Sequence, residues 1–108
     1  LVTVRPVKPA PPWFWQSDRE LDFIVKHVPR GRGRASRAVA LWSAFCAVAN
    51  QSRGSSFIVR RSVLSKLSGL SVEAVAETLQ DLDAIAMIER IGKPTPMGQR
   101  YALHTPVP

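Results

Sequence analysis

Cysteine and histidine are nearly absent from this chain of 108 residues, which contains one cysteine, Cys46, and two histidines, His27 and His104. A single thiol excludes a disulfide within the chain and any zinc site built from several thiolates. Neither histidine has a cysteine, aspartate or glutamate at a metal-ligand spacing beside it. We therefore expect no metal, no cofactor and a reducing, cytoplasmic location.

The motifs of common enzyme classes are missing as well. The sequence has no Gly-Lys-Ser or Gly-Lys-Thr phosphate loop. Gly31 and Gly33 lack the third glycine and the preceding strand of a dinucleotide-binding fingerprint. None of the serines stands in the context of a nucleophile elbow. We expect that the protein is not an enzyme.

Long apolar runs are also lacking. The longest mostly apolar run, residues 38–49, is interrupted by Ser43 and falls short of the roughly 20 residues that cross a bilayer. We expect a soluble protein with no membrane partner. With 45% hydrophobic residues, the chain is long enough for one compact core and too short for two. The proline-rich residues 1–12 predict a basic tail or linker, residues 13–104 one domain, and residues 105–108 a C-terminal tail.

Acidic residues are scarce, because eight Asp and Glu face fifteen Lys and Arg, and the formal net charge is +7. This surplus favours a polyanionic partner, since phosphates that bind basic side chains release counterions. The charges are also separated along the chain. Eight basic residues lie in a stretch without any acid: Arg30, Arg32, Arg34, Arg37, Arg53, Arg60, Arg61 and Lys66. Four acids lie in residues 71–85, which contain no base: Glu73, Glu77, Asp81 and Asp83.

Two helices are predicted in the first half of the domain. An accessory helix at residues 17–28 begins with a capping box from Ser17 to Glu20, and its apolar residues Leu21, Ile24, Val25 and Val28 share one face. A core helix at residues 35–51 carries apolar residues three and four positions apart: Val39, Trp42, Phe45, Cys46 and Ala49. Cys46 on that face is predicted to pack rather than to react. The loop between the helices, residues 30–34, is read equally well as a phosphate-tracking loop or as a solvated connection.

A helix-turn-helix is predicted at residues 60–85. A short strand at residues 57–59 precedes it and is available to pair with a later hairpin. The first helix, about residues 61–68, is expected to bury Val63, Leu64 and Leu67. Gly69 then takes a left-handed turn, Leu70 fills that turn, and Ser71 caps the second helix. Residues that point inward from the second helix are Val75, Leu79 and Leu82.

Two strand-like runs follow, from Met87 to Ile91 and from Arg100 to His104. The residues between them, from Gly92 to Gly98, are rich in glycine and proline and predict a loop. Residues 87–104 are therefore expected to form an antiparallel β-hairpin. The predicted fold class is mainly α with this small hairpin.

A pattern of apolar and turn residues resembles the winged helix-turn-helix superfamily. It consists of Phe57-x-Val59, Leu64, Gly69-Leu70-Ser71, Val75, Leu79, Leu82, Ala86-Met87-Ile88-Glu89-Arg90 and Tyr101-x-Leu103. More narrowly, it is similar to the bacterial, plasmid and phage branch that includes multiple-antibiotic-resistance-type regulators and replication initiators. The resemblance covers roughly residues 35–104. It implies a DNA-binding module of transcription regulation or replication, whose second motif helix lies in the major groove while the wing touches the adjacent minor groove.

The resemblance also implies which residues would meet DNA. Groove-facing residues of the second helix would be Ser71, Val72, Glu73, Ala74, Glu77 and Gln80. On the wing they would be Lys93 and Arg100. Two features depart from the pattern: arginine, at position 60 or 61, stands where most relatives have a Ser, Thr or Asp cap, and the second helix is acidic. Carboxylates repel phosphates, so we expect DNA binding that is weak or led by backbone contacts, or no DNA binding through that helix.

Two functions remain open at this stage. In the first, a DNA-binding module contacts phosphates of double-stranded DNA through Arg30, Arg32, Arg34, Arg37, Arg60, Arg61, Lys66, Lys93 and Arg100. In the second, a winged-helix interaction module uses the acidic face of Glu73, Glu77 and Asp81 to bind a basic protein surface. Homodimerisation is a variant of the second, in which this face docks on the arginine loop of another copy.

Overall fold

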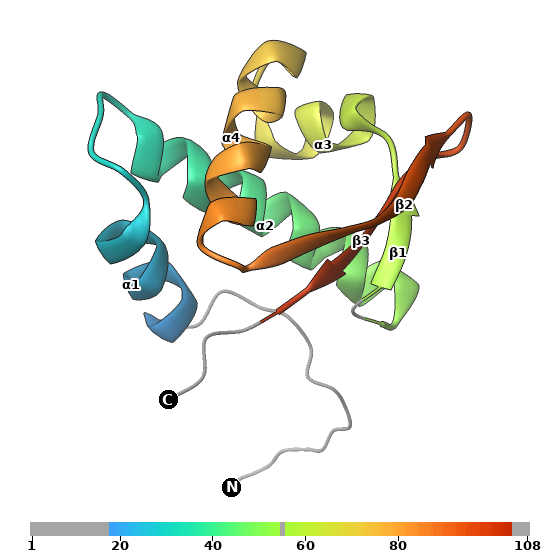
Figure 1. Cartoon of the computed structure of the whole chain (residues 1–108), viewed down its shortest axis with the longest axis horizontal. Coiled ribbons are helices and arrows are strands. Elements are labelled where there is room, and N and C mark those ends of the chain that lie inside the picture. Colours follow the sequence, from blue (N-terminus) through green and yellow to red (C-terminus); the bar gives the residue numbers. More distant parts are fainter. Residues whose placement is uncertain (1–17, 55, 105–108) are drawn as a thin grey trace, which may run out of the picture.

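The computed structural model describes residues 18–54 and 56–104. The predicted tails at residues 1–12 and 105–108, and the capping role of Ser17, lie outside these residues. The described elements, in chain order, are helix α1 (Asp18–His27), helix α2 (Arg34–Ser52), strand β1 (Ser56–Val59), helix α3 (Arg61–Ser68), helix α4 (Val72–Ala84), strand β2 (Ile88–Thr95) and strand β3 (Gly98–Leu103) (Figure 1). The strands form an antiparallel sheet in the order β1-β3-β2. The protein is therefore mainly helical with a small antiparallel sheet.

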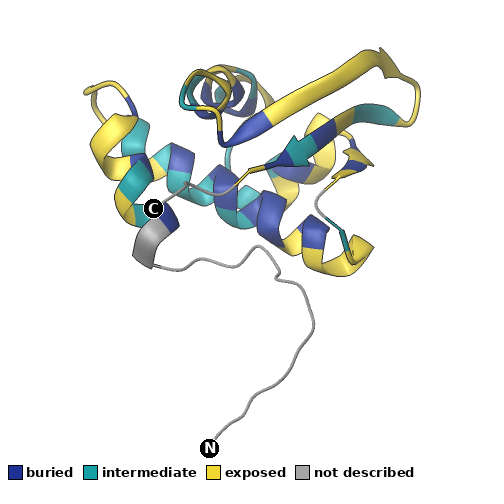
Figure 2. Ribbon diagram, turned by 60° about the horizontal axis from the view of Figure 1, so that its bottom comes forward, coloured by how far each residue is buried: buried dark blue, intermediate teal, exposed yellow. Residues whose placement is uncertain are grey.

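Helix α2 is the centre of the core. It packs against α1, α3, α4 and β1, so helices and sheet cover it on several sides (Figure 2). The predicted packing residues Trp42, Phe45, Cys46 and Ala49 are buried as expected. Because α2 is covered on more than one side, a second set of residues is buried that the one-face prediction omitted: Ala38, Leu41, Ala44 and Val48.

Cys46 is a packing residue, as the sequence predicted. Its side chain is buried in the core cluster, and it is a free thiol. Burial, followed by the negative charge of Glu20, raises the pKa of the Cys46 thiol to about 12. Because the thiolate is the reactive form, the folded protein holds this group unreactive near neutral pH.

Three apolar residues that were predicted to be buried are exposed instead. Val25 of α1 and Val63 and Leu67 of α3 have 59%, 41% and 50% of their surface accessible. Helix α1 packs mainly on α2, and its buried face is limited to residues such as Ile24 and Val28. Helix α3 has only eight residues, and Leu64 is the one buried among them. A short helix that meets the core along one line buries fewer residues than its periodicity suggests.

The turn between α3 and α4 follows the prediction. Gly69 adopts a left-handed conformation, with φ of 78°, and ends α3. The Ser71 hydroxyl accepts a hydrogen bond of 3.1 Å from the amide of Ala74, so Ser71 caps α4. Leu70 packs against the core, as expected for a residue that fills the turn. The predicted inward residues of α4 are fully buried: Val75, Leu79 and Leu82.

The β2–β3 hairpin is longer than the sequence predicted, because β2 continues to Thr95 and only Pro96 and Met97 form the turn. The prediction of a loop from Gly92 to Gly98 was wrong. Strand β2 lies at the edge of the sheet, where a proline such as Pro94 costs no ladder hydrogen bond.

Hydrogen bonds hold this extension in place. The side-chain nitrogen Nε2 of Gln99 donates hydrogen bonds of 3.1 Å to the main-chain oxygens of both Ile91 and Gly92, where the strand register shifts. The Thr95 hydroxyl donates to the main-chain oxygen of Gly98 at 2.9 Å and accepts from the Met97 amide. The hairpin is therefore braced at the register shift and at its turn rather than open at its end.

Candidate nucleic-acid interface

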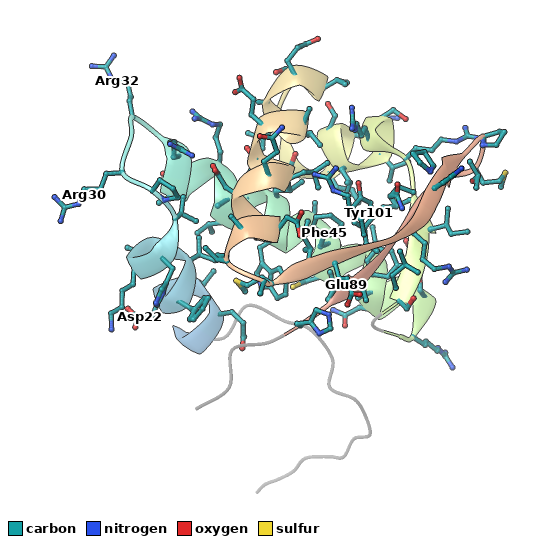
Figure 3. All side chains as sticks on the ribbon, viewed as in Figure 1. Asp22, Arg30, Arg32, Phe45, Glu89 and Tyr101 are labelled. Carbon is teal, nitrogen blue, oxygen red and sulfur yellow. The ribbon has the colours of Figure 1, made fainter. Side chains whose placement is uncertain are left out.

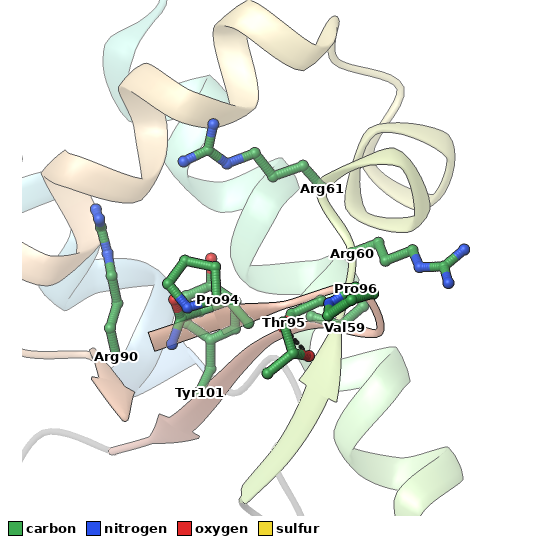
Figure 4. Close-up of a pocket in the computed structure, with 10 residues that line it drawn as sticks. Val59, Arg60, Arg61, Arg90, Pro94, Thr95, Pro96 and Tyr101 are labelled. Atoms are coloured by element: carbon green, nitrogen blue, oxygen red, sulfur yellow. Dashed lines mark hydrogen bonds between the residues drawn. The ribbon is translucent and has the colours of Figure 1, made fainter. Parts of the chain in front are cut away.

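A pocket of about 420 Å³ lies where β1 passes into α3 and the β2–β3 hairpin approaches (Figure 4). It combines basic and apolar side chains from elements far apart in the sequence. The residues that line it are Val59, Arg60, Arg61, Arg90, Pro94, Thr95, Pro96, Gly98, Gln99 and Tyr101. No carboxylate is among these described residues. The three arginines of the lining, Arg60, Arg61 and Arg90, therefore have no negative charge beside them in the lining itself.

Sheet register brings Arg90 into this pocket. Arg90 pairs with Tyr101 across β2 and β3, and Tyr101 pairs with Phe57 across β3 and β1. Cross-strand partners share a face of the sheet, and Phe57 and Ile88 on this face are buried. Arg90 thus projects from the core-facing side of the sheet at the pocket, which explains how a charged residue lies beside the core.

Tyr101 anchors the inner side of the pocket. Only 2% of its surface is exposed, and its ring meets the Phe45 ring edge-on with 5.1 Å between centroids. Burial raises the pKa of Tyr101, while the positive charges of Arg90 and Arg61 and an interaction of its hydroxyl with Arg61 act in the opposite direction. The hydroxyl of a core residue is therefore held beside two guanidinium groups.

The arginines of the pocket have no acidic partner in the described residues. The salt bridges there are Lys26–Asp22, Arg34–Asp81 and His104–Glu89, and none involves Arg60, Arg61 or Arg90. Uncompensated guanidinium groups that border a concave surface create a positive potential there. This potential favours an anion, and guanidinium geometry suits phosphate in particular.

The N-terminus of α3 adds to this potential. Arg60 stands at the N-cap, as the sequence suggested for position 60 or 61, and its side chain makes no capping hydrogen bond. The first turn of α3 contains no acidic residue. The early amide groups of a helix carry partial positive charge, and here the side chain of the N-cap residue does not cap them.

On α4, by contrast, a charged side chain has a partner of opposite charge within the protein. Asp81 lies 2.6 Å from Arg34 at the start of α2, and only 13% of the Asp81 side chain is exposed. This hydrogen bond is the main cause of the raised pKa of Arg34, and the charges of Asp81 and Glu77 add to it. Arg34, a predicted phosphate contact, is thus engaged within the protein. The acidic charge of α4 is correspondingly reduced.

The remaining basic residues of the first half do not reach the pocket. Arg30 and Arg32 are exposed on the α1–α2 loop and point away from Tyr101 (Figure 3). Arg37 donates a hydrogen bond of 3.2 Å to the main-chain oxygen of Arg32, so it helps to order this loop. The structure therefore separates the arginines of residues 30–37 from the pocket lined by Arg60, Arg61 and Arg90.

The other predicted phosphate contacts are spread over the second half. Lys66 is exposed in the last turn of α3, and Lys93 is exposed on β2. Arg100 pairs in register with Ile58 and Ile91, which places it on the outer face of the sheet, opposite Arg90. Its guanidinium lies 3.3 Å from the Ser56 hydroxyl. Arg60 and Arg61 are the only predicted phosphate contacts among the residues that line the pocket.

The predicted groove-facing residues lie on the first turns of α4 and along its outer side. Exposed side chains among them are Ser71, Val72, Glu73, Glu77 and Gln80, while Ala74 is half-buried. The Ser71 hydroxyl is already used as the helix cap. The accessible face of α4 therefore carries neutral and acidic side chains and no basic one.

Sequence reasoning missed Arg90 as a site residue. It was treated as one position in an alternating strand. The signal was present, because period-two alternation puts residue 90 on the same side as buried Ile88. A charged residue on the core-facing side of a strand needs an outlet or a partner, and here the pocket provides the outlet.

Comparison with known proteins adds nothing to this geometry, since no protein family, curated protein or solved structure matches the chain. Within residues 18–54 and 56–104, no cluster of three His, Cys, Asp or Glu side chains is placed to hold a metal ion. None of the helices described has the length and hydropathy required to cross a membrane.

Proposed function

We propose that the protein is a winged helix-turn-helix module that binds duplex DNA mainly through its phosphates, in transcription regulation or replication. The order of β1, α3, α4 and an antiparallel hairpin supports the winged-helix assignment. In this assignment α4 is the groove-facing helix and the β2–β3 hairpin is the wing.

The observation that carries the proposal is the set of three arginines without an acidic partner between α3 and the hairpin. Arg61 of α3 and Arg90 of β2 both line this concave surface, and Arg60, directly before α3, lines its edge with its guanidinium turned outward (Figure 4). Phosphate contacts of this kind position a protein on DNA without reading its sequence. Each phosphate that is neutralised contributes about 0.9 to the slope of log affinity against log salt concentration.

The exposed face of α4 supports binding led by the DNA backbone rather than by bases. Glu73 and Glu77 accept hydrogen bonds but cannot donate them, and they repel nearby phosphates. Sequence preference would therefore come partly from DNA shape and deformability. The alternative is a module that binds a basic protein surface through Glu73, Glu77 and Asp81. It has one acidic contact fewer, because Asp81 is already paired with Arg34.

The test is fluorescence anisotropy of a labelled duplex at a series of salt concentrations. The wild-type affinity should fall steeply with salt, and Arg90→Ala should make the slope shallower by about 0.9. Lys26→Ala is the matched control, because it removes the same charge from α1, where Lys26 pairs with Asp22. Binding that is indifferent to salt, or an equal effect of both variants, would refute the proposal.

A further inference from the structure

We propose that the same pocket is a binding site for a free phosphomonoester of nucleotide size, whose phosphate caps the N-terminus of α3. Occupancy by this ligand would exclude the DNA backbone from Arg60, Arg61 and Arg90. The binding site itself follows from the pocket geometry. The competition with DNA rests on the proposed function.

The phosphate end of the site is defined by charge and by an unfilled helix cap. Arg60 occupies the position where a Ser or Asp side chain would normally accept from the first amides of α3, and it makes no such bond. A phosphate oxygen is a strong acceptor for these amides. Arg61 and Arg90 line the same pocket and have no acidic partner in the described residues. The ligand would thus supply the cap that the Arg60 side chain does not provide.

The size of the pocket indicates more than a phosphate group. Its volume of about 420 Å³ falls within the range of small-molecule sites, roughly 300–1,000 Å³. Away from the charges, the lining includes Val59, Pro94, Pro96 and the buried Tyr101, together with Thr95, Gly98 and Gln99 of the hairpin. The first four provide an apolar wall of few rotatable bonds, which suits a flat ring. Charge at one end and an apolar wall at the other match a mononucleotide.

The frame of the pocket is preorganised. A Cβ atom added at Gly98 would lie 2.5 Å from the Val59 oxygen and 2.9 Å from the Arg60 nitrogen, so β3 is pressed against the start of α3. The side chains of Gln99 and Thr95 brace the hairpin by donating hydrogen bonds to main-chain oxygens. A site that is already ordered loses little entropy on binding, which favours affinity for a small ligand.

The experiment titrates the protein without DNA, using adenosine 5′-monophosphate, inorganic phosphate and adenosine as probes, and follows backbone amide signals by NMR. We expect the monophosphate to bind most tightly, with its largest shifts at the amides of Arg61 and Ser62 and in the hairpin at Gln99. Equal affinity for adenosine and its monophosphate, or shifts confined to another face, would overturn the proposal. Phosphate that binds as tightly as the monophosphate would overturn the nucleotide-sized part.

Arg60→Asp is the decisive variant. An aspartate at the N-cap supplies an internal cap and replaces a positive charge, so α3 should still form while monophosphate binding weakens about tenfold or more. Lys26→Ala is the control, because it removes a positive charge from α1, where Lys26 pairs with Asp22. A thermal melt keeps the result interpretable: the variant should be at least as stable as the wild type. Unchanged monophosphate affinity in a folded Arg60→Asp protein would contradict the site.

Competition separates this inference from the proposed function. Displacement of a labelled duplex by the monophosphate, with no displacement by adenosine, would support a shared pocket. Simultaneous binding of duplex and monophosphate would overturn the exclusion. Monophosphate binding by a protein that has no affinity for duplex would uphold the ligand site and refute DNA binding, so the two failures are distinguishable.

Discussion

On α4 the Asp81 carboxylate pairs with an arginine of the same chain, whereas the arginines around the pocket have no acidic partner among the described residues. Asp81 is paired with Arg34 at 2.6 Å and is largely withdrawn from solvent. Arg60, Arg61 and Arg90, by contrast, line a concave surface without an acid. The two regions are adjacent in the unit formed by α3, α4 and the β2–β3 hairpin. Of these two regions, the pocket rather than the helix expected to face a groove therefore offers positive charge to an external anion.

The largest expected effect comes from disrupting the frame of the pocket with Gly98→Ala. The added Cβ would collide with the backbone of Val59 and Arg60, and Gly98 has a φ of 123° that a side chain disfavours. We expect a loss of about 3 kcal/mol in the free energy of unfolding, measured by denaturant titration.

Gly92→Ala is the control for this change. Gly92 also has a positive φ, 72°, but open space surrounds the position of its Cβ. Gly92→Ala should therefore lower the free energy of unfolding by only about 1 kcal/mol, because the backbone strain is its sole cost. If both variants lose the same stability, the close approach of β3 to the start of α3 does not constrain the hairpin.

The next prediction concerns the salt bridge between Asp81 of α4 and Arg34 of α2. Asp81→Asn removes the charge that holds Arg34, so Arg34 becomes available to phosphates and the acidic helix loses one repulsive charge. We expect duplex affinity to rise about threefold, in the range of an exposed ion pair. The salt dependence should steepen by about 0.9 for the additional phosphate contact. Both quantities come from anisotropy titrations.

Asp83→Asn is the matched control, because Asp83 is an exposed carboxylate on the same helix and forms no salt bridge in the described residues. It removes an equal charge without releasing an arginine. Its effect on the salt dependence should therefore be smaller. Identical slopes for the two variants would show that Arg34 does not contact phosphates.

The smallest effect concerns Tyr101, which is the only tyrosine of the chain and can therefore be titrated by its ultraviolet absorbance. Burial raises its pKa, and the positive charges of Arg90 and Arg61 oppose that rise. Arg90→Ala should move the pKa of Tyr101 further upward, whereas Lys26→Ala should leave it unchanged. A downward movement would mean that Arg90 does not act on the pocket as the structure indicates.

This titration also has a consequence for stability. Because the folded protein binds the phenolic proton more tightly than the unfolded chain, the contribution of Tyr101 is fully present below its ordinary pKa of 10.0. It is lost as pH rises through the higher pKa of the folded state. Stability at alkaline pH should therefore fall above about pH 10, as checked by thermal melts.

Local patterns predicted much of the second half of the fold. The Gly69 turn, the Ser71 cap and the buried row of Val75, Leu79 and Leu82 were all readable, because each depends on residues within a few positions of one another. The prediction was wrong where burial depended on neighbours. Leu67 has a suitable spacing for a core residue, but no element of the described chain covers it sufficiently to bury it.

The candidate site was predicted only in part. Arg60 and Arg61 were identified from their position before α3, whereas Arg90 was not. Its place in the pocket depends on pairing with Tyr101 in another strand. Arg34 was expected to bind phosphate, yet it meets Asp81, which lies 47 positions later. Spacing along a chain gives no information on contacts of this range.

By itself, the sequence determined the helices, the turn between α3 and α4, and the excess of positive charge, because backbone propensity, capping and composition act locally or additively. Only the tertiary structure decided which charges are available. Packing of α4 on α2 brings Asp81 to Arg34, and strand pairing turns Arg90 towards Arg61. Electrostatic interactions depend on distance in space, and chain folding sets that distance independently of sequence separation.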